Sequence, residues 1–380
     1  MIYLDNAATS WPKPESVYDA VAKAMRESGG NPGRSGHRLA LNAARDIRGA
    51  RDTLATLFGI PDPDRIAFTL NATWAINVAL KGLLEPGDHV ICGSMEHNAV
   101  ARPLRALERR GVIVTKVYSS PSTGLDPDAV RAAVRPETML VATCHASNVS
   151  GAISPIAGLG ALCRERGIAF LVDAAQSAGS IPIDVEAMRI DMLAFPGHKG
   201  LLGPQGTGGL YVAQSLELST LIEGGTGSES RSVEQPMRMP DRFESGTPNT
   251  PGIAGLAAGT RYILERGAEA IGLAEAELCA RLVDGLSRVR GVAVYGPPPG
   301  NPRASVVTIS IAGVDPADAA AILDDSFGIA SRAGLHCAPD AHEALGTLET
   351  GALRLSPGAF TSADEIDACV EAVSAIAASA

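Results

Sequence analysis

The chain has 380 residues, of which 46% are hydrophobic and 19% charged, a composition that supports a large core and argues against disorder. Its 42 acidic and 32 basic residues give a net charge of -10, so binding to a nucleic-acid backbone is not expected as its main task. This length fits one large domain and one smaller domain.

No stretch approaches the roughly 18 apolar residues of a membrane span, and the first residues show no signal-peptide pattern. The 6 cysteines include no CxxC pair, and neither they nor the 7 histidines show zinc-ligand spacing. Cysteines without such a framework are typical of the reducing cytosol. We therefore expect a cytoplasmic protein with no membrane partner and no metal site.

In the middle of the chain, short apolar segments alternate with helical patterns. The expected strands cover 111–118, 139–144, 168–173, 191–195 and 210–213. The expected helices cover 126–134, which begins with an Asp-Pro signal, and 155–166, which ends before Gly167. This alternation predicts an α/β fold whose large domain has a mostly parallel sheet with helices on both faces.

The C-terminal part alternates over a shorter length. Helices are expected at 273–289, 315–327 and 362–378, with strands at 306–313 and 351–358. This pattern predicts a smaller C-terminal α+β domain. We expect residues 15–255 to form the large domain, and residues 1–14 and 256–380 to form the smaller one.

Polar residues follow the expected strands of the parallel sheet, where ligands usually bind. They form three groups: Ser147-Asn148, Asp173 with Gln176, and His198-Lys199. Taken alone, Asp173 could simply cap the next helix, and Lys199 could be a solvated charge. Lys199, however, lies in a turn of small residues that could hold it partly dehydrated, which would make its amine nucleophilic toward an aldehyde.

An aldehyde cofactor with matching requirements is pyridoxal phosphate. It needs a lysine for a Schiff base, a carboxylate opposite its pyridinium nitrogen and an anion site for its phosphate. Lys199 and Asp173 would supply the first two, and a helix starting near Ala72-Thr73 would supply the third, although a plain capped helix is the alternative there. No P-loop, dinucleotide fingerprint or HExxH pattern competes with this interpretation.

The segment SRAGLHCAP (331–339) carries Arg332, His336 and Cys337 in an expected loop. We expect an exposed thiol there, and nearby positive charge favours the reactive thiolate of a cysteine. The alternative is an inert small residue in a bend. The other five cysteines lie in apolar strands or helices and are expected to pack.

Several segments occur in a characteristic order: DNAAT (5–9), MEHNAV (95–100), SNVSG (147–151), DAAQSAG (173–179), GHKGLLGPQGTG (197–208), FESGTPN (243–249) and RAGLHCAP (332–339). Together they resemble the cysteine desulfurases of the class V aminotransferase group, which have the fold-type I architecture of pyridoxal-phosphate enzymes. The resemblance covers essentially the whole chain. The RxGxxCAP loop resembles the second desulfurase subgroup, whose cysteine loop is short.

The resemblance implies removal of sulfur from L-cysteine to give L-alanine. Lys199 would form the Schiff base with pyridoxal 5'-phosphate and later move the substrate Cα proton. His97 would stack on the cofactor ring, and Arg332, His336 or His97 could assist proton movement. The Cys337 thiolate would attack the substrate sulfur and carry it as a persulfide until a reductant or an acceptor protein takes it.

The remaining implied roles are binding roles. The residues expected to bind the cofactor are Ala72, Thr73, His97, Asn148, Asp173, Gln176, His198, Lys199 and Thr247. Thr247 would reach the phosphate from a partner subunit, so a homodimer is implied. Asn148, Arg354 and Arg332 would bind the substrate.

Two departures from the family pattern bear on these roles. Pro196 stands where many relatives carry a serine or threonine that contacts the phosphate. The segment between Gly225 and Phe243 is shorter than expected in well-studied members, and it would shape the rim that an acceptor protein meets.

Three alternatives stay open. Selenocysteine lyase and cysteine-sulfinate desulfinase share every cofactor residue with the desulfurases. A class V aminotransferase-like enzyme for another amino acid would leave Cys337 incidental. A scaffold without catalysis would have no use for Lys199, Asp173 and His97 together.

Overall fold

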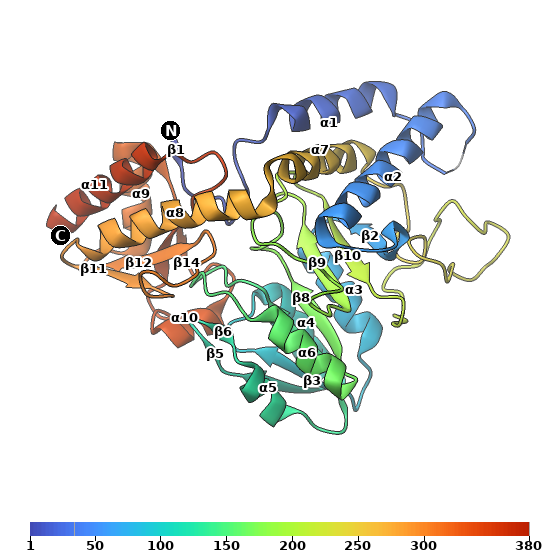
Figure 1. The fold of residues 1–380 in the computed structure, drawn as a ribbon, viewed down its shortest axis with the longest axis horizontal. Coiled ribbons are helices and arrows are strands. Elements are labelled where there is room, and N and C mark those ends of the chain that lie inside the picture. The colour runs from blue at the N-terminus through green and yellow to red at the C-terminus, as the bar shows by residue number, and fades with distance from the viewer. Residues whose placement is uncertain (34, 380) are drawn as a thin grey trace.

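The large domain is built on a seven-stranded sheet in the order β2-β10-β9-β8-β7-β3-β4 (Figure 1). The computed structural model describes residues 1–33 and 35–379. The strands of this sheet are β2 (Ile66–Thr69), β3 (His89–Gly93), β4 (Ile113–Val117), β7 (Thr138–Cys144), β8 (Ala169–Asp173), β9 (Met192–Pro196) and β10 (Gly208–Val212).

The sheet is parallel except at one strand. β10 runs antiparallel to both β9 and β2, whereas the pairs from β9 across to β4 are all parallel. Strands β3, β9 and β10 are buried along their whole length, as expected of strands covered on both faces. The predicted α/β fold with a mostly parallel sheet is therefore confirmed.

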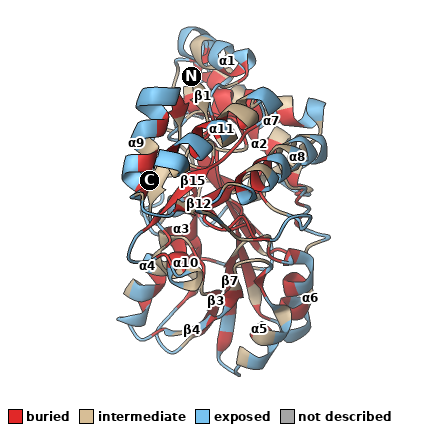
Figure 2. Cartoon of the chain, turned by 90° about the vertical axis from the view of Figure 1, so that its left-hand side faces the viewer, coloured by how far each residue is buried: buried red, intermediate tan, exposed pale blue. Residues whose placement is uncertain are grey.

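Helices cover both faces of the sheet and form two separate apolar cores. Figure 2 shows buried strands in the centre and helices with exposed outer faces around them. The elements of this layer and its loops are α1 (Glu15–Glu27), α2 (Arg38–Phe58), η1 (Pro63–Arg65), α3 (Ala72–Leu83), α4 (Asn98–Glu108), β5 (Ser119–Ser120), β6 (Gly124–Leu125), α5 (Pro127–Ala133), α6 (Ile156–Arg166) and α7 (Thr250–Arg266).

The smaller domain is an antiparallel sheet in the order β11-β12-β15-β14, packed against helices that bury a third core. This confirms the predicted C-terminal α+β domain. Its elements are α8 (Ala268–Ser287), β11 (Val292–Tyr295), β12 (Val307–Ile311), α9 (Pro316–Phe327), β13 (Ile329–Ala330), β14 (Arg332–Gly334), α10 (Pro339–Leu345), β15 (Ala352–Leu355) and α11 (Ala363–Ser379). The N-terminal strand β1 (Ile2–Tyr3) joins this domain by pairing with β13.

The division expected at residue 255 falls inside α7. This helix packs against α1 and α2 of the large domain, whereas α8 packs against α11 and β11 of the smaller one. Gly267 stands between the two helices with a φ of 83°. We propose that the division lies at Gly267, since cutting α7 would break one continuous packed helix.

The helices and strands predicted from residue 111 onward are present close to their expected bounds, although α8 begins at Ala268 rather than 273. Among the helices formed by the described residues, none is long and apolar enough to span a membrane.

Two glycines of α6 test how closely this helix packs against its neighbours in the large domain. A Cβ at Gly160 would lie 2.0 Å from the Met188 carbonyl oxygen, whereas a Cβ at Gly158 would meet only Pro127 at 3.5 Å. We predict that Gly160→Ala lowers the free energy of unfolding by about 2 kcal/mol or more through overpacking. Gly158→Ala should leave it unchanged or raise it by up to about 1 kcal/mol, since alanine favours helix. Urea unfolding of both variants checks this, and equal effects would contradict the packing described.

Candidate active site

A pocket of about 290 Å³ lies at the carboxyl ends of β7, β8 and β9, between the two domains. It brings together ten of the twelve residues selected from the sequence: Ala72, Thr73, His97, Asn148, Asp173, Gln176, His198, Lys199, Arg332 and Arg354. Thr247 lines a different hollow, and Cys337 lies beside the pocket next to Arg332. The pocket is also lined by Ala7 and Ala8 of the N-terminal segment, which the sequence analysis did not select.

The N-terminal segment holds the backbone that carries Lys199. The His198 carbonyl oxygen accepts hydrogen bonds from the backbone N–H of Ser10 at 3.0 Å, the Thr9 hydroxyl at 3.1 Å and the Lys13 ammonium at 2.9 Å. The Ser10 hydroxyl donates to the Lys199 carbonyl oxygen at 2.7 Å. Because several donors converge on two adjacent carbonyls, the base of the Lys199 side chain is fixed.

Burial is the main influence on the Lys199 amine. It lowers the pKa of Lys199 to about 8, with Asp173 opposing the shift and Arg354 adding to it. Across the part of the chain that the structure describes, the Lys199 ammonium has no hydrogen-bond partner. The amine is therefore free to meet a ligand in the pocket, with a pKa lowered by burial.

Asp173 faces a second buried carboxyl that the sequence analysis missed. Burial raises the pKa of Asp173, and it raises the pKa of Glu96 to about 8, with Asp173 as the second cause. Glu96 accepts hydrogen bonds from the Thr143 hydroxyl at 3.1 Å and the Cys144 N–H at 2.8 Å. Glu96, with a pKa of about 8, therefore holds a proton at neutral pH, and Asp173 is the member of the pair that lines the pocket.

One end of the pocket is formed by the start of α3. The Asn71 side chain accepts from the Trp74 N–H at 2.9 Å, which leaves the N–H groups of Ala72 and Thr73 at the pocket edge. Free N–H groups at a helix N-terminus favour a negatively charged ligand. Nearby, the buried Nδ1 of His198 has no partner among the described residues.

His97 presents one ring nitrogen to the pocket. Its Nδ1 accepts from the Ala99 N–H at 3.0 Å, so it caps α4. Burial, together with the charges of Lys199 and Arg332, lowers the pKa of His97 to about 4. The ring is therefore neutral, and its Nε2 carries the hydrogen on the side away from the cap.

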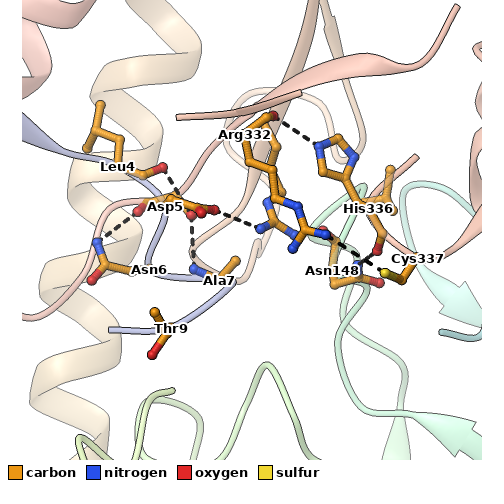
Figure 3. A network of polar contacts seen from close by, with 12 residues as sticks. Leu4, Asp5, Asn6, Ala7, Thr9, Asn148, Arg332, His336 and Cys337 are labelled. Atoms are coloured by element: carbon orange, nitrogen blue, oxygen red, sulfur yellow. Dashed lines mark hydrogen bonds and ion pairs between the residues drawn. The ribbon is translucent and has the colours of Figure 1, made fainter. Parts of the chain in front are cut away.

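Arg354 is 1% exposed and joins three parts of the chain. It donates to the Asp5 carboxylate at 2.9 Å and to the Asn148 carbonyl oxygen at 3.1 Å, while its buried Nε has no partner among residues 1–33 and 35–379. Figure 3 shows Asp5 and Asn148, the two partners of Arg354, within one network of polar contacts. Asp5 was not selected from the sequence, because its partner is 349 residues away.

Cys337 lies in a tight turn, and it is exposed as expected. The Ala338 N–H donates to the Leu335 carbonyl at 2.9 Å, and the two central residues have φ values of 50° (His336) and 58° (Cys337). These values are typical of a type I′ turn, which normally requires glycine or asparagine. Each such residue costs roughly 1–3 kcal/mol, so surrounding contacts must hold the turn in place.

Contacts from the large domain hold this turn. The Asn148 amide donates to the His336 carbonyl at 2.7 Å, and the Asn98 N–H donates to the Cys337 carbonyl at 2.8 Å. Arg332 approaches the Cys337 Sγ to 3.8 Å (Figure 3). The thiol is therefore fixed beside a cation at the edge of the pocket. The other cysteines are buried, apart from the partly exposed Cys144.

Thr247 lies in a separate hollow of about 260 Å³, lined by Phe68, Leu70, Trp74, Leu221 and Ile222 among others. Within one chain it therefore does not line the pocket that holds Lys199. Its expected contact with the site of a partner subunit stays a prediction. The loop between β10 and α7, which includes residues 226–242, extends from the same side of the molecule (Figure 1).

Comparison with known proteins gives consistent matches. The family model described as Aminotransferase class-V matches residues 2–369. A protein of Methanothermobacter thermautotrophicus named "Probable cysteine desulfurase" is 35% identical, with coverage of 99% of this chain and 94% of that protein. One of Halobacterium salinarum with the same name is 36% identical, with coverage of 98% and 91%. The solved cysteine desulfurase of Thermococcus onnurineus NA1 has a TM-score of 0.94 at 33% identity, covering 100% of this chain and 95% of that one.

The partly buried Lys199 ammonium should destabilise the protein when no ligand is bound. Because folding lowers its pKa from 10.5 to about 8, the penalty is full below pH 8 and disappears as pH rises toward 10.5. We predict that Lys199→Met raises the free energy of unfolding of the ligand-free protein by about 2 kcal/mol at neutral pH. The gain should shrink as the pH is raised, as measured by urea unfolding between neutral pH and about pH 9.5. A gain that does not change with pH would contradict this.

Proposed function

The chain belongs to the class V aminotransferase family, and from this premise we propose that it is a cysteine desulfurase dependent on pyridoxal 5'-phosphate. It would remove sulfur from L-cysteine, giving L-alanine and a persulfide on Cys337. The relatives named cysteine desulfurase support this reaction. The observation that carries it is the pairing of a dehydrated lysine in the pocket with an exposed cysteine fixed at the pocket edge.

The residues present fit the cofactor. Lys199 has a free, dehydrated amine for its aldehyde, and Asp173 has a buried carboxylate for its pyridinium nitrogen. The start of α3 and the unpaired Nδ1 of His198 suit its phosphate. His97 would cover the ring, and Gln176 would meet its phenolic oxygen. When bound, the cofactor supplies an electron sink that weakens bonds at the substrate Cα.

Residues of the protein would bind the substrate and move its Cα proton. The Arg354 guanidinium, with its unpaired Nε, and the Asn148 amide would bind the substrate carboxylate, assisted by Arg332. A carboxylate held at two points fixes the Cα proton relative to the Lys199 amine. In its neutral form, Lys199 would then accept that proton and return it to the substrate.

The sulfur step would occur at Cys337. Its thiolate attacks the substrate sulfur, so a sulfur–sulfur bond forms as the substrate carbon–sulfur bond breaks. The electron pair of that bond stays with the three-carbon skeleton, which gains a proton and leaves as alanine. The persulfide keeps the transferred sulfur until a thiol reductant or an acceptor protein takes it. Arg332, 3.8 Å from the Cys337 sulfur, would stabilise the thiolate.

The alternatives differ from this proposal at Cys337 or in the substrate. For an aminotransferase-like enzyme the thiol would be incidental, and its constrained turn beside Arg332 would serve no purpose. Selenocysteine lyase and cysteine-sulfinate desulfinase would use the same pocket, so relative turnover of the three amino acids separates them. The names of the relatives favour cysteine.

We also propose that the protein works as a homodimer in the cytoplasm. The hollow around Thr247 is mainly apolar, and beside it Leu70 and Ile222 are 54% and 45% exposed. A second chain packed against this hollow would cover the exposed apolar side chains. Thr247 of the first chain would then lie at the phosphate site of the second chain. An acceptor protein, if one takes the sulfur, would meet the rim formed by residues 226–242.

The role of Cys337 predicts a specific loss. Cys337→Ser should reduce release of alanine and sulfide from L-cysteine by at least about a hundredfold, since it removes the nucleophile. Cofactor absorbance should stay, and Cys163→Ala, which changes a buried cysteine of α6, should retain activity. Full activity of the serine variant with cysteine would contradict the persulfide role.

Shared active sites predict complementation between chains. Lys199→Ala dimers should be inactive, and Thr247→Val dimers should retain the cofactor about tenfold less well after losing one phosphate contact. Mixing and reassociating the two variants should restore one complete site per mixed dimer, measured as cofactor binding and alanine release. A monomeric sedimentation mass, or no recovery on mixing, would contradict the dimer.

A further inference from the structure

Two buried histidines, one within the cysteine turn and one on the helix behind it, belong to no step of the proposed function. His336 precedes Cys337, and His342 lies on α10, which follows the turn; they are 3% and 0% exposed. The His336 Nδ1 lies 3.0 Å from the His342 Nε2. The His336 Nε2 lies 3.1 Å from the Arg332 carbonyl oxygen, and the His342 Nδ1 lies 2.8 Å from the Thr347 hydroxyl.

These contacts fix the direction of every hydrogen bond. The Arg332 carbonyl can only accept, so the His336 Nε2 carries a hydrogen and, in the neutral ring, its Nδ1 accepts. His342 must then donate from Nε2 and accept at Nδ1 from the Thr347 hydroxyl. The result is a chain of donors from Thr347 through His342 and His336 to Arg332, with both rings neutral. Burial accordingly lowers the pKa of His336 to about 3 and also lowers the pKa of His342.

The chain of hydrogen bonds closes the loop that carries Cys337. One end is the Arg332 carbonyl, at the start of the loop, and the other is Thr347, just beyond α10. The turn between them has two consecutive positive φ values, which an unsupported chain would leave. Figure 3 shows the His336 ring bonded to Arg332 on one side of the turn that carries Cys337.

The apolar surroundings make this series of hydrogen bonds sensitive to the loss of any one donor. The turn and α10 pack in an apolar cluster that includes Met95, Val149 and Ala338. A ring nitrogen left without a partner there could not be hydrated readily. The two rings therefore hold one arrangement only as long as both keep their partners.

We propose that His342 is a positioning residue for the sulfur step: it donates to His336 and thereby holds the Cys337 thiol in its constrained turn at the pocket edge. This inference rests on the proposed function, in which Cys337 attacks the substrate sulfur. It predicts that His342 affects the rate of sulfur transfer without affecting the binding of substrate or cofactor, since it lies outside the pocket.

The test compares two substitutions that each keep half of the imidazole. In His342→Gln the longer side chain can place an amide N–H near the position of Nε2, whereas in His342→Asn the amide reaches only the position of Nδ1. His342→Asn should lower kcat for alanine release from L-cysteine about tenfold, the effect of one lost buried hydrogen bond, with KM unchanged. His342→Gln should keep at least about a third of the activity, because the bond to His336 is restored.

A second pair covers the case in which the asparagine variant does not fold. Thr347→Val removes the hydroxyl that fixes the His342 tautomer at nearly constant volume, and Thr347→Ser keeps it. The valine variant should lower kcat about threefold and the serine variant should not. In protein without cofactor, backbone amide exchange in the segment 332–338 should rise about tenfold in His342→Asn and stay near the wild-type rate in His342→Gln.

The outcomes separate the two proposals. An asparagine variant with wild-type kcat, or a glutamine variant as slow as the asparagine variant, would overturn the role of His342. Raised KM or lost cofactor in the asparagine variant would also overturn it, since it would indicate general damage to the pocket. Wild-type protein that forms no alanine from cysteine would instead contradict the proposed function, and the exchange measurement would then still report on the turn.

Discussion

One buried cation holds the active pocket together. Arg354 comes from the smaller domain, its carboxylate partner Asp5 comes from the N-terminal segment, and its carbonyl partner Asn148 follows a strand of the large domain. A guanidinium with 1% exposure is tolerable only while these partners stay in place. Its buried Nε lacks a partner among the described residues, and in the proposed function this same group, which joins the domains, also binds the anionic substrate.

Dehydration distributes charge within this pocket. It makes the Lys199 amine easier to deprotonate and keeps His97 neutral, and it raises the pKa of Glu96 so that this carboxyl beside Asp173 holds a proton. Each shift has burial as its first cause. The fold therefore tunes these groups chiefly by excluding water around a sheet edge, and the contacts to the N-terminal segment and the smaller domain complete that enclosure.

The sequence was most informative where chemistry and local structure share one segment. Strand-end positions and a glycine-rich turn identified Asp173 and Lys199, and the family motifs added His97 and Arg354. Asp5, Glu96 and His342 were missed, because what distinguishes each is a contact made by folding: with Arg354, with Thr143 and Cys144, and with His336. The division expected at residue 255 falls inside α7, whose end at Arg266 is marked by no change in composition. The proposed role of Thr247 depends on contact with a second chain.

The central claim is that sulfur passes from cysteine to Cys337. The most direct test is one turnover with isotopically labelled cysteine and no reductant, followed by alkylation and mass analysis of the cysteine-containing peptides. The account predicts one added sulfur on the Cys337 peptide, matched by one alanine per active site. Alanine formed without sulfur on Cys337, or sulfur found on a different cysteine, would contradict it.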